Sequence, residues 1–303
     1  MAGKILLFYK YIKLENPQEI ADWQRKLCLS LELKGRIILA CEGINGTVGG
    51  SEEATKKYIE AMEAHPLFTN IDFKDAAGSA AHFPRLRIMI KKEIVNLGID
   101  PEKLTIKDTG QYLTPQEAHE LMNQAPEDLV ILDTRNDYET AIGTFTNAIA
   151  PNTRYFREFP AYIDKNLDLF KDKQVLMTCT GGVRCERASA YVKLKGVAKN
   201  VMHLKGGIHR YIEQYPDGHF KGSNYVFDAR ISHAVSNDLL SECNLCKTAT
   251  DYYENCKNAF CNKQFLVCAS CKDAFGQSCS VSCVELIKNN KVSVRTKEAR
   301  IAS

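Results

Sequence analysis

The feature that most constrains the fold is the stretch MTCTGGVRCERAS, residues 177–189, where two cysteines bracket a glycine loop. The apolar run QVLMT that leads into it predicts a buried strand, and a helix is expected from near Arg184 to about Leu194. Gly181 and Gly182 permit the tight or positive-φ conformations of a sharp turn. Strand, loop and helix in this order are typical of a mainly parallel α/β sheet, in which loops after the strands carry the ligand site.

The loop has the residues of an anion cradle. Its backbone N–H groups can point into one concavity at the helix N-terminus, where the helix dipole adds partial positive charge. In such settings the pKa of a thiol falls from about 8.5 to roughly 3.5–7.5. The sequence therefore predicts a reactive thiolate at Cys179, with Arg184 supplying a full charge and with an active-site loop made of Thr180, Gly181, Gly182 and Val183.

The second cysteine of the loop leaves two interpretations open. A glycine loop can bring Cys179 and Cys185 to the Cα separation of a disulfide, about 4.4–6.8 Å. Cys185 could then resolve a persulfide or sulfenate formed on Cys179, as in redox-active thiol pairs. A small packed residue without a chemical role explains Cys185 equally well.

The first hundred residues alternate strand-like and helix-like patterns. Capping residues Asn16 and Ser51 predict helices that run to Leu33 and Ala64. Strands are expected at Lys4–Ile12 and Ile37–Cys41, with a hairpin turn at Gly43-Ile44-Asn45-Gly46, and at Leu86–Ile90. The order β-α-β-β-α-β predicts a ferredoxin-like domain, which belongs to the α+β class.

The domain boundaries in the rest of the chain follow from strand-like apolar runs and from the glycines and prolines between them. Strands LVILDTR and NVMHL flank the loop strand in sequence and complete a parallel α/β domain. The expected boundaries are a ferredoxin-like domain at 1–95, a connector with one helix capped by Thr114 at 96–125, the parallel α/β domain at 126–222, a linker and cysteine-rich module at 223–284, and a basic tail at 285–303.

Eight of the twelve cysteines fall in the cysteine-rich module. In a reducing compartment such a cluster indicates metal binding rather than disulfides. Eight thiolates suffice for two structural, four-coordinate zinc ions, which would stabilise a segment too short for a core of its own. Alternating pairs favour a cross-braced arrangement, with sequential pairing as the alternative: Cys243, Cys246, Cys268 and Cys271 at one ion, and Cys256, Cys261, Cys279 and Cys283 at the other.

Composition places few further limits. The formal charge of +3 does not by itself indicate a nucleic-acid binder, although a tail with Lys288, Lys291, Arg295, Lys297 and Arg300 can grip phosphates or simply be solvated. No uncharged apolar run reaches about 18 residues, and the N-terminus lacks a long apolar region, so we expect a cytoplasmic protein without a membrane span. No flavin or nicotinamide motif of the Gly-x-Gly-x-x-Gly kind occurs. No oligomeric state is predicted.

A ferredoxin-like sheet can present basic and aromatic groups to splayed RNA bases. Candidates here are Tyr9, Tyr11, Arg85 and Arg87, and a group of possible substrate-binding residues: Arg36, Glu42, Asn45, Lys91 and Lys92. Whether Glu42 contacts substrate or caps local backbone is left open.

The glycine loop resembles the active-site loop of the rhodanese domain. LVILDTRNDYETAIGTF is similar to that family's first block, in which Asp133, Arg135 and Glu139 match as supporting residues, and VMHLKGGIHRYIE is similar to its closing block. The resemblance implies that Cys179 is a persulfide-forming nucleophile. A sulfurtransferase is therefore one expected function, and a non-catalytic scaffold is disfavoured by a thiol in an anion cradle.

The whole chain resembles the bacterial rhodanese-domain tRNA uridine hydroxylases. The marks are GRIILACEGINGT, CTGGVRCERAS, the linker segment NYVFDAR and the cysteine-rich module. This resemblance implies oxygen-dependent C5 hydroxylation of the wobble uridine in the tRNA anticodon, with molecular oxygen as co-substrate and Cys179, Arg184 and Cys185 as catalytic residues. The flanking domains favour this function over sulfur transfer, for which about a third of the chain would suffice.

Overall fold

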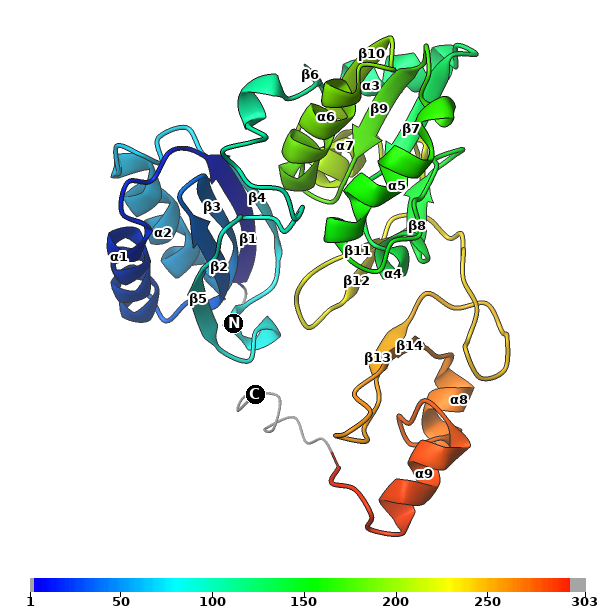
Figure 1. Cartoon of the computed structure of the whole chain (residues 1–303). Coiled ribbons are helices and arrows are strands. Elements are labelled where there is room, and N and C mark those ends of the chain that lie inside the picture. Colours follow the sequence, from blue (N-terminus) through cyan, green and yellow to red (C-terminus); the bar gives the residue numbers. More distant parts are fainter. Residues whose placement is uncertain (1–2, 295–303) are drawn as a thin grey trace.

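The computed structural model describes residues 3–294 and consists of three parts (Figure 1). The N-terminal part is a single five-stranded sheet in the order β4-β1-β3-β2-β5, with two helices on one face. Its elements are β1 (Gly3–Tyr11), α1 (Pro17–Ser30), β2 (Lys34–Ala40), β3 (Gly43–Ser51), α2 (Glu52–Ala64), β4 (Asp72–Ala77) and β5 (Leu86–Ile90).

The ferredoxin-like arrangement is confirmed, but its last strand is not the predicted one. β4 pairs antiparallel with β1 and is the fourth strand of the ferredoxin-like sheet. Leu86–Ile90, predicted as that strand, is instead a fifth strand, parallel to β2 at the opposite edge. The strand DFKDAA escaped prediction because its fully buried side chain is Lys74, so it lacks apolar alternation. The helices begin at the predicted caps, with the side chains of Asn16 and Ser51 accepting backbone N–H bonds.

The predicted turn at Gly43–Gly46 is wrong. The hairpin turns at Cys41 and Glu42, since Ala40 pairs with Gly43, and Asn45-Gly46 lies within β3. Gly46 is required for packing rather than for a turn: a Cβ there would lie 2.4 Å from the Phe8 ring. The Asn-Gly pair therefore signals close packing on one side of the strand and leaves the Asn45 side chain on the other.

The second part is built on a four-stranded parallel sheet in the order β6-β10-β9-β7. Residues 111–124, expected in a connector, contribute the edge strand and a helix to it. Its elements are β6 (Gln111–Leu113), α3 (Pro115–Gln124), β7 (Leu129–Asp133), α4 (Asp137–Thr140), β8 (Gly143–Phe145), α5 (Phe159–Lys165), β9 (Gln174–Thr178), α6 (Val183–Lys195), β10 (Asn200–Leu204) and α7 (Gly207–Gln214).

The third part follows β11 (Phe220–Tyr225) and β12 (Ser232–Ala234), which join β8 in a small sheet. It holds a two-stranded sheet and two helices: β13 (Tyr253–Asn255), β14 (Gln264–Leu266), α8 (Ala269–Ala274) and α9 (Val281–Lys288). Most of the predicted basic tail, from residue 295 onward, lies outside the described residues. Among residues 3–294, no helix is both long and apolar enough to cross a membrane.

Helix α6 is the element that joins the first two parts. Nine consecutive residues, 184–192, are buried, so the helix is covered on every side. One side packs on the parallel sheet. On the other, the hydroxyl of Tyr9 donates to Glu186 at 3.0 Å and that of Tyr11 donates to the Val183 carbonyl at 3.2 Å. The open face of the N-terminal sheet is thereby docked against the start of α6.

A buried ion-pair cluster completes this contact. The Arg187 guanidinium, whose side chain is 0% exposed, donates to Glu93 and lies 3.6 Å from Glu42. Its second amino group donates to the Ile99 carbonyl at 2.6 Å. Glu42 also accepts the Ile94 backbone N–H at 2.8 Å. Glu42 therefore ties the hairpin to local backbone and to α6.

We expect Arg187→Met to lower the free energy of unfolding by about 3–5 kcal/mol, because the substitution leaves two buried carboxylates without their cation. Urea denaturation measures the effect. Lys57→Met is the matched control, since its ion pair with Glu53 is exposed and should be worth about 0.3–0.5 kcal/mol. Equal losses in the two variants would contradict a structural role for the Arg187 cluster.

Candidate active site

Cys179 follows β9 directly and is fully buried at the start of the glycine loop. Its sulfur accepts the Gly182 backbone N–H at 3.1 Å, and the N–H groups of Arg184 and Cys185 also point toward it. The Cys185 thiol donates to the same sulfur, and Thr134 Oγ1 lies 3.7 Å from Cys185 Sγ. The predicted cradle is therefore present, and the two thiols are in hydrogen-bond contact without a disulfide.

The cradle makes Cys179 acidic. Burial alone raises the pKa of this thiol, but three influences together outweigh it: the hydrogen bond from Cys185, the positive charge of Arg184, and the backbone N–H groups of Cys185 and Arg184. The result is a pKa of about 6. Burial and the adjacent Cys179 charge hold the pKa of Cys185 well above its ordinary value. At neutral pH the pair therefore consists of one thiolate and one thiol donor.

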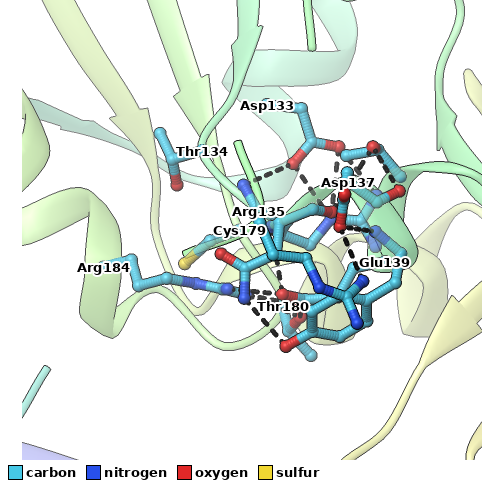
Figure 2. Close-up of polar contacts among 12 residues, drawn as sticks. Asp133, Thr134, Arg135, Asp137, Glu139, Cys179, Thr180 and Arg184 are labelled. Atoms are coloured by element: carbon cyan, nitrogen blue, oxygen red, sulfur yellow. Dashed lines mark hydrogen bonds and ion pairs between the residues drawn. The ribbon is translucent and has the colours of Figure 1, made fainter. Parts of the chain in front are cut away.

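Arg184 is held in place by a carboxylate from α4 (Figure 2). Its two terminal nitrogens donate to the two oxygens of Glu139 at 2.6 and 2.7 Å, and Thr180 Oγ1 donates to Glu139 at 3.3 Å. Burial alone would lower the pKa of Arg184, but the charge and hydrogen bonds of Glu139 outweigh burial and raise this pKa above its ordinary value. Since the bidentate pair fixes the guanidinium plane, the positive charge near the sulfur is permanent and oriented.

Asp133 and Arg135 form a second buried pair that does not reach the sulfur. Arg135 donates to both Asp133 oxygens and to the Gly143 carbonyl, and Thr144 Oγ1 donates to Asp133 at 3.0 Å. These contacts secure the start of β8 beside the end of β7. Asp133 and Arg135 therefore stabilise the strands next to the loop, whereas Glu139 holds Arg184 directly.

The loop is also braced by the closing glycine motif. The backbone N–H groups of Ile208 and His209 donate to the carbonyls of Cys179 and Thr180 at 2.9 and 3.1 Å. Gly207 has a φ of +68°, and a Cβ there would lie 2.5 Å from the Cys179 carbonyl oxygen. Only glycine permits this approach, which explains the Gly-Gly pair of LKGGIH.

A pocket of about 550 Å³ opens between the loop and the N-terminal sheet. The sheet face turned away from α1 and α2 supplies one wall, where Leu7, Thr47 and Arg36 lie opposite one another on three adjacent strands. The other walls come from the chain after β5, the glycine loop and the linker. Residues of particular interest among those that line it are Arg36, Asn45, Lys91, Lys92, Cys179, Thr180, Gly181, Val183, Arg184 and Phe227.

The structure brings most predicted site residues to this pocket. Arg36, Lys91 and Lys92 are exposed at it, and Asn45 lines it while donating to the Ile94 carbonyl at 3.0 Å. Glu42 is absent from its lining within residues 3–294, because its carboxylate is engaged with Ile94 and Arg187.

Several residues of the site were missed by sequence reasoning. Phe227 of the NYVFDAR segment forms a wall of the pocket, with its ring 6.0 Å from the Arg184 guanidinium carbon. Glu186 accepts hydroxyls from Tyr9, Thr109 and Tyr112, the last at 2.7 Å. Burial raises the pKa of Glu186. The available sequence signals were the segment NYVFDAR for Phe227 and the charged run Arg-Cys-Glu-Arg at the start of a helix for Glu186.

The eight clustered cysteines gather into the two groups expected from alternating pairs. One group holds Cys243, Cys246, Cys268 and Cys271, and the other holds Cys256, Cys261, Cys279 and Cys283, with all sulfurs of a group within 4.8 Å of one another. Four thiolates at such spacing suit a tetrahedral ion with sulfur bonds of about 2.3 Å. The two clusters can therefore hold metal ions.

Family models match three consecutive parts of the chain. A model described as "UPF0176 acylphosphatase like domain" matches residues 3–94, "Rhodanese-like domain" matches 114–214, and "Rhodanase C-terminal" matches 221–284. Among solved structures, a rhodanese-like domain protein from Staphylococcus aureus aligns with 33% of this chain and 90% of its own at 25% identity; its TM-score of 0.27 is too low to add to the assignment. The fold and the loop define a multidomain protein built around a rhodanese domain.

Curated relatives match nearly the whole chain. Proteins named tRNA uridine(34) hydroxylase are 41% identical in Corynebacterium jeikeium (88% of this chain, 89% of the relative), 40% in Onion yellows phytoplasma (92% and 91%) and 39% in Streptococcus pyogenes (92% and 88%). The chain belongs to this hydroxylase family, which confirms the resemblance found in the sequence. The family name favours hydroxylation over sulfur transfer.

We expect Cys179 to be alkylated by iodoacetamide with a rate that rises through a midpoint near pH 6, because the thiolate is the reactive form and its pKa is about 6. Mass spectrometry of the Cys179 peptide measures the rate. Arg184→Gln should move the midpoint upward, since a positive charge beside the sulfur is removed. Arg154→Gln, which removes an exposed arginine, is the control and should leave it unchanged. A wild-type midpoint near 8.5 would contradict the cradle.

Proposed function

We propose that this protein hydroxylates C5 of the wobble uridine, position 34, in the anticodon of tRNA, with Cys179 as the reactive group. The substrate follows from the names of the relatives, and the chemistry of the site is compatible with it. Because tRNA is the substrate, we place the protein in the cytoplasm. Molecular oxygen is the proposed source of the added oxygen atom.

The observation that carries the proposal is the position of Cys179. Its thiolate lines a pocket whose opposite wall is a sheet face carrying Arg36, and Lys91 and Lys92 stand beside it. A sulfurtransferase that accepts small sulfur donors has no need of such a wall. Enzymes that act on a base take it out of the stack into an active-site pocket, and this arrangement provides a pocket next to a nucleophile.

The proposed roles of the loop residues follow from their contacts. Arg184 and the loop N–H groups keep Cys179 anionic, and Glu139 keeps Arg184 oriented toward it. Cys185 donates a hydrogen bond to the thiolate and stands where it could take up a proton or a sulfur-bound group. Burial of the pair excludes water from the nucleophile, which strengthens each of these electrostatic contacts.

We expect cells lacking the gene to lose 5-hydroxyuridine derivatives from their tRNA, with activity restored by the wild-type gene and abolished in Cys179→Ser. Mass spectrometry of anticodon nucleosides measures the loss, and growth under heavy-oxygen gas identifies the oxygen source. Cys28→Ser, which alters a buried thiol in the N-terminal core, is the control for cysteine loss as such. Unchanged nucleosides together with a loss of thiosulfate sulfurtransferase activity in the deletion strain would contradict the proposal and favour a sulfurtransferase.

We further propose that zinc occupies both cysteine groups as a structural ion, since four thiolates leave no open coordination position for catalysis. Purified protein should contain about two zinc ions per chain, and Cys246→Ser and Cys261→Ser should each lose about one. Elemental analysis measures the content, and Cys41→Ser, outside both groups, should keep both ions. Retention of full metal content in either cluster variant would contradict the assignment.

A further inference from the structure

Phe227 is a large apolar side chain in the segment 226–231, directly after β11, that the fold leaves partly uncovered. Phe227 is 41% exposed, yet it lies between Val226, which is buried, and Asp228, whose carboxylate pairs with Arg230 at 2.6 Å. The rings of Phe227 and Tyr225 are 5.3 Å apart, in an edge-to-face arrangement. Ligand pockets are lined mainly by apolar and aromatic side chains, so the position of this ring at the wall of the pocket makes it available to a ligand.

The backbone around Phe227 is fixed by bonds within its own segment and by bonds to the N-terminal domain. Val226 N–H donates to the Ile231 carbonyl at 2.8 Å, which closes the segment on itself. Ala229 N–H donates to the His82 carbonyl at 2.9 Å, and Arg230 donates to the Ala77 carbonyl at 2.8 Å. The ring is therefore presented by a segment anchored to the N-terminal domain, so little ordering is required when a ligand stacks on it.

Three cations line the same pocket on the side of the N-terminal domain. Arg36 projects from β2, and Lys91 and Lys92 follow β5. Within residues 3–294 no salt bridge engages any of the three, whereas the other charged residues of the lining are paired: Arg184 with Glu139 and Glu93 with Arg187. The pocket thus combines a stacking surface with unneutralised positive charge, as in sites for single-stranded nucleic acid.

The size of the pocket limits what it can hold. A volume of about 550 Å³ lies within the range of roughly 300–1,000 Å³ of small-molecule sites, which is too small for a duplex but sufficient for one nucleotide. Cys179 lines the same space. A base that enters it is therefore brought to the thiolate.

We propose that the pocket binds one nucleotide extruded from a single-stranded RNA loop, with its base stacked on Phe227 and the adjacent phosphates held by Arg36, Lys91 and Lys92. The inference rests on the proposed function for the identity of the base. Stacking on Phe227 does not distinguish between bases, since every base has an aromatic face, and the cations bind the flanking phosphates. Phe227 and the cations therefore serve to bind the nucleotide, whereas Cys179 serves the reaction.

Phe227→Ala should weaken binding of an anticodon stem-loop by about five- to 150-fold, the range that base–aromatic stacking contributes. Phe227→Tyr should restore it, because the ring is retained. Fluorescence anisotropy with a labelled stem-loop measures the affinity. Phe260→Ala is the matched control, since that ring is 81% exposed and lies in the cysteine-rich module. Unchanged binding by Phe227→Ala, with a wild-type thermal unfolding curve, would overturn the proposal.

A stem-loop that lacks the base at position 34 separates this inference from the proposed function. Wild-type protein should bind it as weakly as Phe227→Ala binds the intact loop, and Phe227→Ala should not discriminate between the two RNAs. Replacing Arg36, Lys91 and Lys92 by glutamine should lower the slope of log affinity against log salt by about 0.7 for each phosphate that a removed cation had neutralised. Equal wild-type affinity for both RNAs would overturn the site even if hydroxylation is observed, and loss of hydroxylation with the binding pattern intact would overturn only the function.

Discussion

The active site depends on the way helix α6 carries three charged side chains through a region closed to water. Buried charges destabilise a protein unless each has a close partner. Arg184 finds Glu139 within its own domain, but Arg187 finds Glu93 and Glu42 on the N-terminal side, and Glu186 accepts hydrogen bonds from Tyr9 and other hydroxyls. Separation of the two domains would take both carboxylates away from Arg187 and the Tyr9 hydroxyl away from Glu186, so docking is built into the helix that follows the active-site loop.

This arrangement changes what a rhodanese loop can do. The loop supplies a thiolate, and the docked sheet adds a wall with Arg36 and Asn45 opposite to it. The hydroxyls of Tyr9 and Tyr11 are used in the contact with α6, so these two residues serve the docking of the sheet. The sheet face that remains beside them is consequently small, which suits a single base better than an extended strand of RNA.

Local patterns in the sequence predicted most of the fold and the centre of the site. Capping residues placed α1, α2 and α3, and the glycine loop located Cys179 and Arg184, because these features act over a few residues. Three features escaped prediction since they depend on distant partners. β4 is a strand that buries a lysine, Asn45-Gly46 is shaped by the Phe8 ring rather than by a turn, and Phe227 becomes a pocket wall only when two domains meet. For the eight cysteines the alternating pattern favoured the grouping that the structure shows, while sequential pairing stayed open because it depends on how the module folds.

The cysteine-rich module also contacts the residues that support the wall of the pocket. The ring of Tyr225, two residues before Phe227, packs with Tyr253 and Leu266 of the module, and its hydroxyl accepts a hydrogen bond from Gln264 at 3.1 Å. A module with so little apolar core would gain much of its stability from metal ions held by its two cysteine groups. Loss of such an ion, or oxidation of the cysteines, would therefore weaken the packing of Tyr225 and, through it, the support of Phe227 at the wall of the pocket.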